Sequence, residues 1–340
     1  MTVRTLPDDA AQRKLAEFLR RQYPTLKGLE IQELSELGEG WETDLYHLKL
    51  TGKRNGDLEL VLRLYKGPKS LEKAQKEFSL MTNVPRFGIA APRVDTIVTD
   101  SSILGDPFIV MEYIPGGTLE AGIQSDGIAR WIEPMMKTLA RIHSIPWVEI
   151  IPDPQGTLPN PDKPLVFVED LLRGMERSIH RYQLLGFEPT IEWLHQRVKL
   201  GASTTPALIH NDYHPQNALL RNGELLIIDW SFAEVSDGRM DLAWTVMLLS
   251  VLAGKEYRSA ILSAYERAVG EPIANFEYFE AIKLTMRMIT IATWLEDDVE
   301  IPVPRITKQA LLGDYRVHLL NPYRRLNEIT GLEIQVIEEL

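Results

Sequence analysis

Two carboxylates and one amide stand at spacings that could support chemistry on a phosphate group. Asp212 and Asn217 are five residues apart, and Asp229 follows Asn217 by twelve residues. Asn222-Gly223 lies between apolar runs and predicts a tight hairpin, because both turn residues accept a positive φ. Such a hairpin would bring Asn217 and Asp229 together, and their oxygens suit Mg²⁺, which takes few protein ligands beside water and phosphate. Asp212 lies one loop away, where its carboxylate could accept a hydroxyl proton.

The first third of the chain has the pattern of a small β-sheet with flanking helices. Alternating apolar and polar residues predict strands, and the pair Asn55-Gly56 predicts a hairpin turn between two of them. Apolar residues at helical spacing surround this region on both sides. The expected elements are helices over residues 8–23 and 70–83 and strands over residues 46–50, 58–65 and 108–111.

After Pro115-Gly116-Gly117 the pattern becomes mostly helical. The sequence therefore predicts an α+β fold of two lobes. Residues 1–113 form a small β-rich lobe with one main helix, and residues 114–340 form a larger, mostly helical lobe. The expected helices of the larger lobe span residues 128–143, 165–185, 240–253, 256–269 and 276–296.

The central segment resembles a known catalytic loop. His210, Asp212 and Asn217 fit the pattern H-x-D-x-x-x-x-N of protein-kinase-like enzymes, with Asp229-Trp230-Ser231 in the place of Asp-Phe-Gly. The form of this loop, with His214-Pro215 inside it, looks like the aminoglycoside phosphotransferase and choline kinase-like family of small-molecule kinases. Two further segments look like the same family, Ala140-Arg141-Ile142-His143-Ser144 and Asp241-Leu242-Ala243-Trp244.

The resemblance implies an activity, two cofactors and roles for three residues. The chain would transfer a phosphoryl group from ATP, with Mg²⁺, to a hydroxyl of a small molecule. Asp212 would be the catalytic base, and Asn217 and Asp229 would bind the metal. Without the resemblance, each of these side chains could instead cap or brace the end of a strand.

The same resemblance extends to the N-terminal lobe. Gly38, Gly40 and Thr43 lie in a loop whose backbone N–H groups could approach phosphates, although Thr43 stands where kinases have a third glycine. Arg63 occupies the position of the phosphate-binding lysine, and it keeps the positive charge. Glu77 is its expected ion-pair partner, with Glu72 as a rival.

A hinge segment is implied by the resemblance as well. Met111, Glu112 and Ile114 stand where kinases bind the adenine base, and the backbone of Glu112 and Ile114 would hydrogen-bond its edge. The resemblance covers the chain from about Ser35 to about Leu252.

Three other polar residues are expected to be structural. His210 is interpreted as a residue that fixes the catalytic loop, and Asp241 as a helix N-cap or loop anchor. His143 lies on an apolar helix face and is interpreted as a hydrogen-bonded core histidine.

A small-molecule acceptor fits the sequence better than a protein acceptor. Only eleven residues separate Asp229 from Asp241, which leaves no room for a long peptide-binding activation segment, and Asn211 replaces the arginine that many protein kinases carry. A protein kinase and a nucleotide-binding regulator that has lost catalysis remain the alternatives. Arg63 and Thr43 favour the regulator, whereas the intact set of Asp212, Asn217 and Asp229 disfavours it.

Composition limits the partners. The formal net charge is −11, with 37 basic and 48 acidic residues, which argues against nonspecific binding to nucleic acid or an anionic membrane. There is no cysteine, so disulfides and thiolate catalysis are excluded. Residues 1–30 contain no apolar signal segment, so a cytoplasmic location is expected. The oligomeric state is left open by the sequence.

An acidic run follows the last long helical stretch. Glu296, Asp297, Asp298 and Glu300 place four carboxyl groups within the seven residues from Trp294 to Glu300. Acceptor pockets are acidic in the family that the chain resembles, so the resemblance implies that Glu296, Asp297 and Asp298 attract the ammonium groups of an amino sugar or a similar acceptor. Solvated carboxylates at a helix end are the other interpretation.

Overall fold

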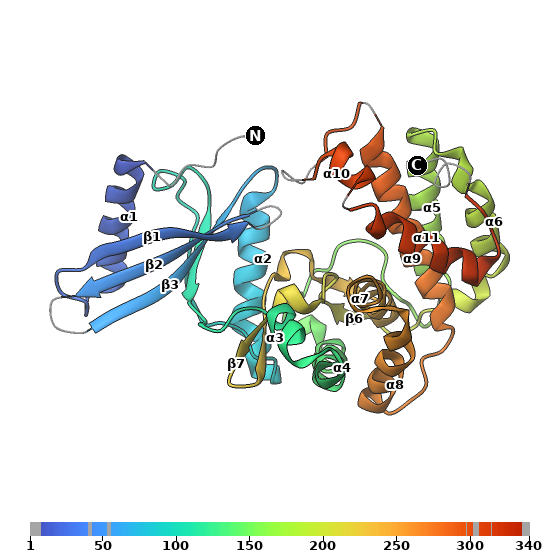
Figure 1. The fold of residues 1–340 in the computed structure, drawn as a ribbon, viewed down its shortest axis with the longest axis horizontal. Helices are drawn as coiled ribbons and strands as arrows, with labels where there is room; N and C mark the ends of the chain where they lie inside the picture. Colours follow the sequence, from blue (N-terminus) through green and yellow to red (C-terminus); the bar gives the residue numbers. More distant parts are fainter. Residues whose placement is uncertain are drawn as a thin grey trace. The chain divides into compact units, whose positions relative to one another are not determined.

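A computed structural model describes residues 8–39, 43–52, 56–296, 298–301, 306–313 and 315–334. The chain folds into two compact units that do not follow chain order. The first unit comprises Met1–Gly117 and Leu219–Ser231, and the second comprises Thr118–Ala218 and Phe232–Leu340. An antiparallel sheet dominates the first unit and helices dominate the second, so the predicted α+β class is confirmed (Figure 1).

The first unit is built on a five-stranded sheet in the order β1-β2-β3-β5-β4, with antiparallel neighbours throughout. Side chains alternate along β3, so Leu62 and Leu64 face a core that includes Leu15 and Leu19 of α1. Helix α1 therefore covers that face of the sheet (Figure 1). Arg63 lies between Leu62 and Leu64 in the strand, so it points to the opposite face. The elements are α1 (Asp9–Gln22), β1 (Glu30–Glu39), β2 (Thr43–Gly52), β3 (Gly56–Tyr65), α2 (Ser70–Asn83), β4 (Val94–Val98) and β5 (Phe108–Glu112).

A hairpin from much later in the chain also belongs to the first unit. Strands β7 (Ala218–Arg221) and β8 (Glu224–Ile227) pair with each other. Asn222 and Gly223 have φ values of 54° and 84°, which confirms the predicted tight turn. The Leu220 N–H donates to the Gly117 carbonyl at 3.2 Å.

The second unit is a helical assembly with one short sheet. Strands β6 (Ala207–Ile209) and β9 (Glu234–Ser236) pair antiparallel, and helix α7 packs against α9, which in turn packs against α11. The helices are α3 (Leu119–Asp126), α4 (Ala129–His143), α5 (Val166–Arg181), α6 (Glu188–Gln196), α7 (Gly238–Ala253), α8 (Arg258–Val269), α9 (Phe276–Leu295), α10 (Lys308–Leu312) and α11 (Val317–Thr330).

The predicted helices agree with the structure apart from their ends. The helix expected over residues 165–185 ends at Arg181, because Gln183 adopts a positive φ of 55° that a helix cannot continue through. The predicted turn residue Asn55 lies outside the described residues. Within the described ranges, no helix is both long enough and apolar enough to cross a bilayer.

Candidate active site

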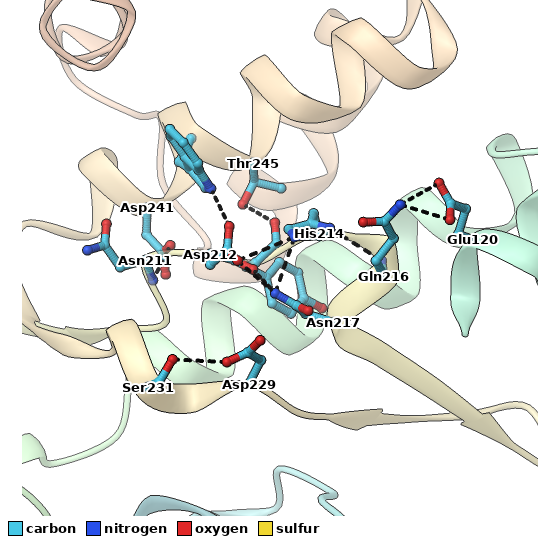
Figure 2. Close-up of polar contacts among 12 residues, drawn as sticks. Glu120, Asn211, Asp212, His214, Gln216, Asn217, Asp229, Ser231, Asp241 and Thr245 are labelled. Carbon is cyan, nitrogen blue, oxygen red and sulfur yellow. Dashed lines mark hydrogen bonds and ion pairs between the residues drawn. The ribbon is translucent and has the colours of Figure 1, made fainter. Parts of the chain in front are cut away.

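The backbone of the central loop is fixed by a buried carboxylate of α7. Asp241 is fully buried, and it accepts hydrogen bonds from the backbone N–H groups of His210 at 2.7 Å and Asn211 at 2.9 Å (Figure 2). Burial raises the pKa of Asp241, but hydrogen bonds and charge from His143 and the loop outweigh burial and hold it below its usual value. Asp241 is thus a loop anchor as predicted, whereas Asp237 caps the helix.

His143 is the second support of this anchor. Its Nε2 lies 3.1 Å from the Asp241 carboxylate and its Nδ1 lies 2.6 Å from the Tyr265 hydroxyl. Both ring nitrogens are therefore engaged, which confirms the interpretation as a hydrogen-bonded core histidine. A Cβ at Gly238 would lie 2.9 Å from His143 Nδ1, so this packing requires a glycine at the start of α7.

The carboxylate of Asp212 is held from two sides. Trp244 Nε1 donates to Oδ1 at 3.0 Å and Asn217 Nδ2 donates to Oδ2 at 2.9 Å. His214 Nε2 lies 3.4 Å from the same Oδ2, and Figure 2 shows Asp212, His214 and Asn217 pointing toward one another. Burial raises the pKa of Asp212, but His214 and Trp244 lower it further than burial raises it. The side chain is 24% exposed, so an ionised carboxylate remains within reach of a solute.

The amide of Asn217 has a defined orientation. Its Nδ2 donates to the Asp212 carboxylate and to the Asp212 carbonyl, each at 2.9 Å. The amide nitrogen therefore faces the loop, and the amide oxygen is turned away from the Asp212 carboxylate. An oxygen in that orientation suits a hard cation.

The neighbouring residues of the loop are also braced. Asn211 has a positive φ of 63°, and its Oδ1 accepts a hydrogen bond from Lys283 of α9 at 2.8 Å. Gln216 donates to Glu120 of α3 at 3.0 Å (Figure 2). Lys283 was not among the residues predicted from the sequence, although it belongs to a basic pair four residues apart in a long, largely apolar helix.

In the first unit, the predicted ion pair between Arg63 and Glu77 is present. Arg63 is 4% exposed, and its Nη1 lies 3.1 Å from Glu77 Oε1. The rival Glu72 is exposed and instead approaches Lys69 at 3.8 Å. Arg63 also makes a second contact that was not predicted from the sequence: its Nη2 donates to Asp229 Oδ1 at 2.7 Å.

Glu77 is a buried carboxylate that fixes the backbone in the first unit, as Asp241 does in the second. It is fully buried, accepts a hydrogen bond from the Tyr65 hydroxyl at 2.6 Å, and also accepts one from the backbone of Trp230. Burial raises the pKa of Glu77, while the charge of Arg63 opposes that rise. A buried carboxylate therefore fixes the backbone next to Asp229.

Asp229 adopts a positive φ of 64°, which aspartate tolerates better than most residues. Its Oδ1 accepts hydrogen bonds from Arg63 and from Ser231, the latter at 3.0 Å (Figure 2). Among the described residues, no donor contacts its Oδ2. The carboxylate oxygen of Asp229 and the amide oxygen of Asn217 are hard donors of the kind that Mg²⁺ binds, so the residues fit this ion.

The predicted nucleotide-binding residues lie on the strands of the first unit. Gly38 is in β1, Thr43 begins β2 and is 2% exposed, and Gly40 lies outside the described residues.

The predicted hinge residues lie at the end of β5 and just beyond it. Met111 and Ile114 are buried, and the Glu112 N–H already donates to the Arg93 carbonyl at 2.8 Å. A base could therefore use only the carbonyl of Glu112 and not its N–H.

The acidic run lies beyond the end of α9. Glu296 and Asp298 are exposed, and Asp297 is outside the described residues. The backbone carbonyl of Glu296 accepts a hydrogen bond from Lys308. The role of this run in substrate binding stays a prediction.

The first unit is built on a five-stranded antiparallel sheet, and the second is a helical unit that carries the central loop. This combination defines the fold of the protein-kinase-like phosphotransferases. The family model described as the phosphotransferase enzyme family (APH) matches residues 33–276. The chain belongs to this family of phosphotransferases.

Similar proteins agree with this assignment at the level of the fold. A crystal structure from Ralstonia eutropha, of a protein assigned as an aminoglycoside phosphotransferase, is 15% identical, covers 96% of this chain and 98% of that chain, and has a TM-score of 0.65. Aminoglycoside phosphotransferase APH(4)-Ia, solved as a thermostable mutant in a ternary complex with AMP-PNP and hygromycin B, is 14% identical, with coverages of 94% and 98% and a TM-score of 0.58.

A curated relative is much longer than this chain. Acyl-CoA dehydrogenase family member 10 of Mus musculus is 25% identical over 276 residues, which are 77% of this chain. The chain spans about a quarter of the length of that relative, 24%.

Proposed function

We propose that the protein is an ATP- and Mg²⁺-dependent kinase of a small molecule, with Asp212 as the catalytic base. The observation that carries this proposal is the state of the Asp212 carboxylate. It is held by Trp244 and Asn217 and is partly exposed, and His214 and Trp244 keep its pKa below the ordinary value despite burial, so it can accept one more hydrogen bond from an acceptor hydroxyl.

The transfer itself needs little covalent chemistry from the protein. The acceptor oxygen forms a bond to the γ-phosphorus of ATP as the bond from that phosphorus to the ADP oxygen breaks, and the hydroxyl proton passes to Asp212. Catalysis is then mainly positioning and stabilisation of charge. Lys283 and Asp241 contribute by fixing the loop that carries Asp212.

We assign nucleotide binding to the first unit. Arg63, held by Glu77, would contact the phosphates, and Gly38, Gly40 and Thr43 would lie beside them. Met111, Glu112 and Ile114 would line the adenine site, and the AMP-PNP complex of the fold relative supports ATP as the donor. Asp229 and Asn217 would hold Mg²⁺, which neutralises charge on the phosphates when it is bound.

The alternatives are weaker. The family match supports a small-molecule phosphotransferase rather than a protein kinase. A regulator without catalysis would not need an ionised carboxylate with one amide and one indole directed at it. An amino-sugar acceptor remains a candidate on two grounds, the run of Glu296, Asp297 and Asp298 and the hygromycin B bound by the relative.

ATP turnover tests the proposal. Purified protein should release ADP in the presence of Mg²⁺ and one acceptor from a panel of amino sugars, sugars, amino alcohols and macrolides, and mass spectrometry should find that acceptor heavier by one phosphoryl group. Omission of Mg²⁺ or its replacement by excess EDTA is the control. Tight nucleotide binding without transfer to any acceptor would instead support the regulator.

The ion pair of Arg63 and Glu77 gives a second test. Arg63→Met and Glu77→Gln should each lower kcat/KM for ATP, and the double variant should be little worse than Arg63→Met, because residues in contact couple. Arg63→Met should be the more severe single change, since Arg63 also pairs with Asp229. The exposed pair of Lys69 and Glu72 provides the matched control, with effects within about 0.5 kcal/mol on stability. Additive losses would show that Glu77 does not act through Arg63.

A further inference from the structure

Helix α9 carries two cations, Lys283 and Arg287, one turn apart. The Lys283 Nζ lies 5.4 Å and the Arg287 Cζ lies 5.6 Å from the centroid of the Trp244 ring. The indole N–H of Trp244 donates to Asp212. One side chain of α7 therefore contacts both cations and the proposed base.

Lys283 has a hydrogen-bonded partner within the protein. It is 8% exposed, and its Nζ donates to Asn211 Oδ1 at 2.8 Å. Burial lowers its pKa, and the charges of Asp241, Glu234 and Asp212 oppose that shift. Lys283 is thus a positioning residue of the loop.

Arg287 differs from Lys283 in having no such partner. Across the described ranges, no carboxylate or carbonyl accepts a hydrogen bond from its guanidinium, which lies over Trp244 and, at 5.9 Å, over Trp294. Burial lowers the pKa of Arg287 to about 10, and Asp212 is the carboxylate that opposes this shift. Contacts with aromatic faces stabilise the charge, but they leave the five N–H donors of the guanidinium unused. The residue is only partly buried, so a solute can reach it.

A neighbouring side chain responds to the same positive charge. The pKa of His318, on α11, is lowered first by burial and then by the charge of Arg287. A desolvated cation without a hydrogen-bonded acid costs stability, and a bound anion would offset that cost. The region beside Asp212 is therefore electropositive on its α9 side.

We propose that the acceptor carries an anionic group, a carboxylate or a phosphate, which Arg287 binds while the acceptor hydroxyl lies at Asp212. The placement of the hydroxyl rests on the proposed function. A planar guanidinium matches either anion with two parallel hydrogen bonds, and Trp244 and Trp294 would flank the bound group. The exposed carboxylates Glu296 and Asp298 have the opposite sign, but within the described ranges no contact joins them to Trp244 or Asn217, whereas Arg287 lies over Trp244.

The test compares four hexoses that differ in charge: glucose, glucosamine, glucuronate and glucose 6-phosphate. Transfer from ATP is followed by ADP release. Binding of each hexose alone is followed by quenching of tryptophan fluorescence, since Trp244 and Trp294 lie at the site. Arg287→Gln removes the positive charge, and Arg287→Lys keeps the charge but lacks the planar guanidinium. Arg173→Gln, at an exposed arginine of α5, is the matched control.

The anionic hexoses should bind and react best, and the preferred one of the two identifies the group as carboxylate or phosphate. Arg287→Gln should weaken binding and raise KM for that hexose by roughly 10- to 100-fold, the expected loss of a hydrogen bond to a charged group. Arg287→Lys should recover part of this loss. Nucleotide affinity should not change, and the loss with glucose should be smaller than the loss with the preferred anionic hexose.

Other results overturn the inference. A preference for glucosamine, or anionic hexoses that bind equally well to Arg287→Gln, would remove Arg287 from acceptor recognition while leaving the proposed function intact. Weaker nucleotide binding in Arg287→Gln, with every hexose affected equally, would assign the guanidinium to the nucleotide instead. Arg287-dependent binding of an anionic hexose without any phosphoryl transfer would uphold the anion site and count against the proposed function.

Discussion

Asp212→Asn should lower turnover by roughly 10²- to 10⁴-fold, the usual contribution of a general base. Asn cannot take the hydroxyl proton, and its NH₂ group must face either Trp244 Nε1 or Asn217 Nδ2, both of which are donors. Nucleotide affinity should stay nearly unchanged, because the residues proposed to bind the phosphates are in the first unit. The measurement is steady-state kinetics with the best acceptor together with titration of a fluorescent ATP analogue.

The pH profile sharpens this test. The pKa of Asp212 lies below its ordinary value, so its charged form persists when the pH falls. If Asp212 alone sets the acid limb of kcat/KM in the wild-type enzyme, kcat/KM should therefore fall only when the pH drops below about 4, the ordinary pKa of an aspartate. Asp162→Asn, an exposed aspartate of the same unit, is the control for loss of one negative charge. Full activity of Asp212→Asn would exclude Asp212 as the base.

Asp229→Ala should abolish the dependence of nucleotide binding on Mg²⁺. Loss of a partner that only supports a ligand typically weakens metal binding by 10- to 100-fold, so loss of the ligand itself should cost roughly 100-fold or more. Asn217→Ala should weaken Mg²⁺ binding less, because a neutral amide contributes less than a carboxylate. It should also reduce turnover, since Asn217 Nδ2 holds the Asp212 carboxylate. Mg²⁺ titrations of nucleotide affinity measure both effects.

A matched variant separates the loss of charge from backbone strain. Ala at a φ of 64° costs about 1–2 kcal/mol, whereas Asn tolerates this conformation. Asp229→Asn should therefore lose Mg²⁺ dependence while unfolding at a higher temperature than Asp229→Ala. Identical Mg²⁺ titration curves for the wild type and both variants would contradict the assignment of Asp229 as a ligand.

Local sequence signals predicted much of the fold. Helical spacing placed α2 over residues 70–83, and the Asn222-Gly223 pair placed a hairpin that the structure contains. These predictions succeeded because helical periodicity and positive-φ turns depend on neighbouring residues. The end of α5 was wrong by four residues because the positive φ of Gln183 has no signature in its own side chain.

The sequence by itself determined which chemical groups stand in the central loop and that Asp212, Asn217 and Asp229 occur at spacings suited to phosphoryl transfer. Through the resemblance to kinases, it also named Glu77 as the expected partner of Arg63 with Glu72 as a rival, and the structure decided for Glu77. Only the tertiary structure decided the supports of these groups. Asp241, Trp244 and Lys283 reach the loop from 30 to 72 residues away in sequence, and they touch it because α7 and α9 pack together. That Arg287 has no hydrogen-bonded acid among the described residues likewise depends on which side chains the packing of α7, α9 and α11 brings near it, and no local pattern encodes that.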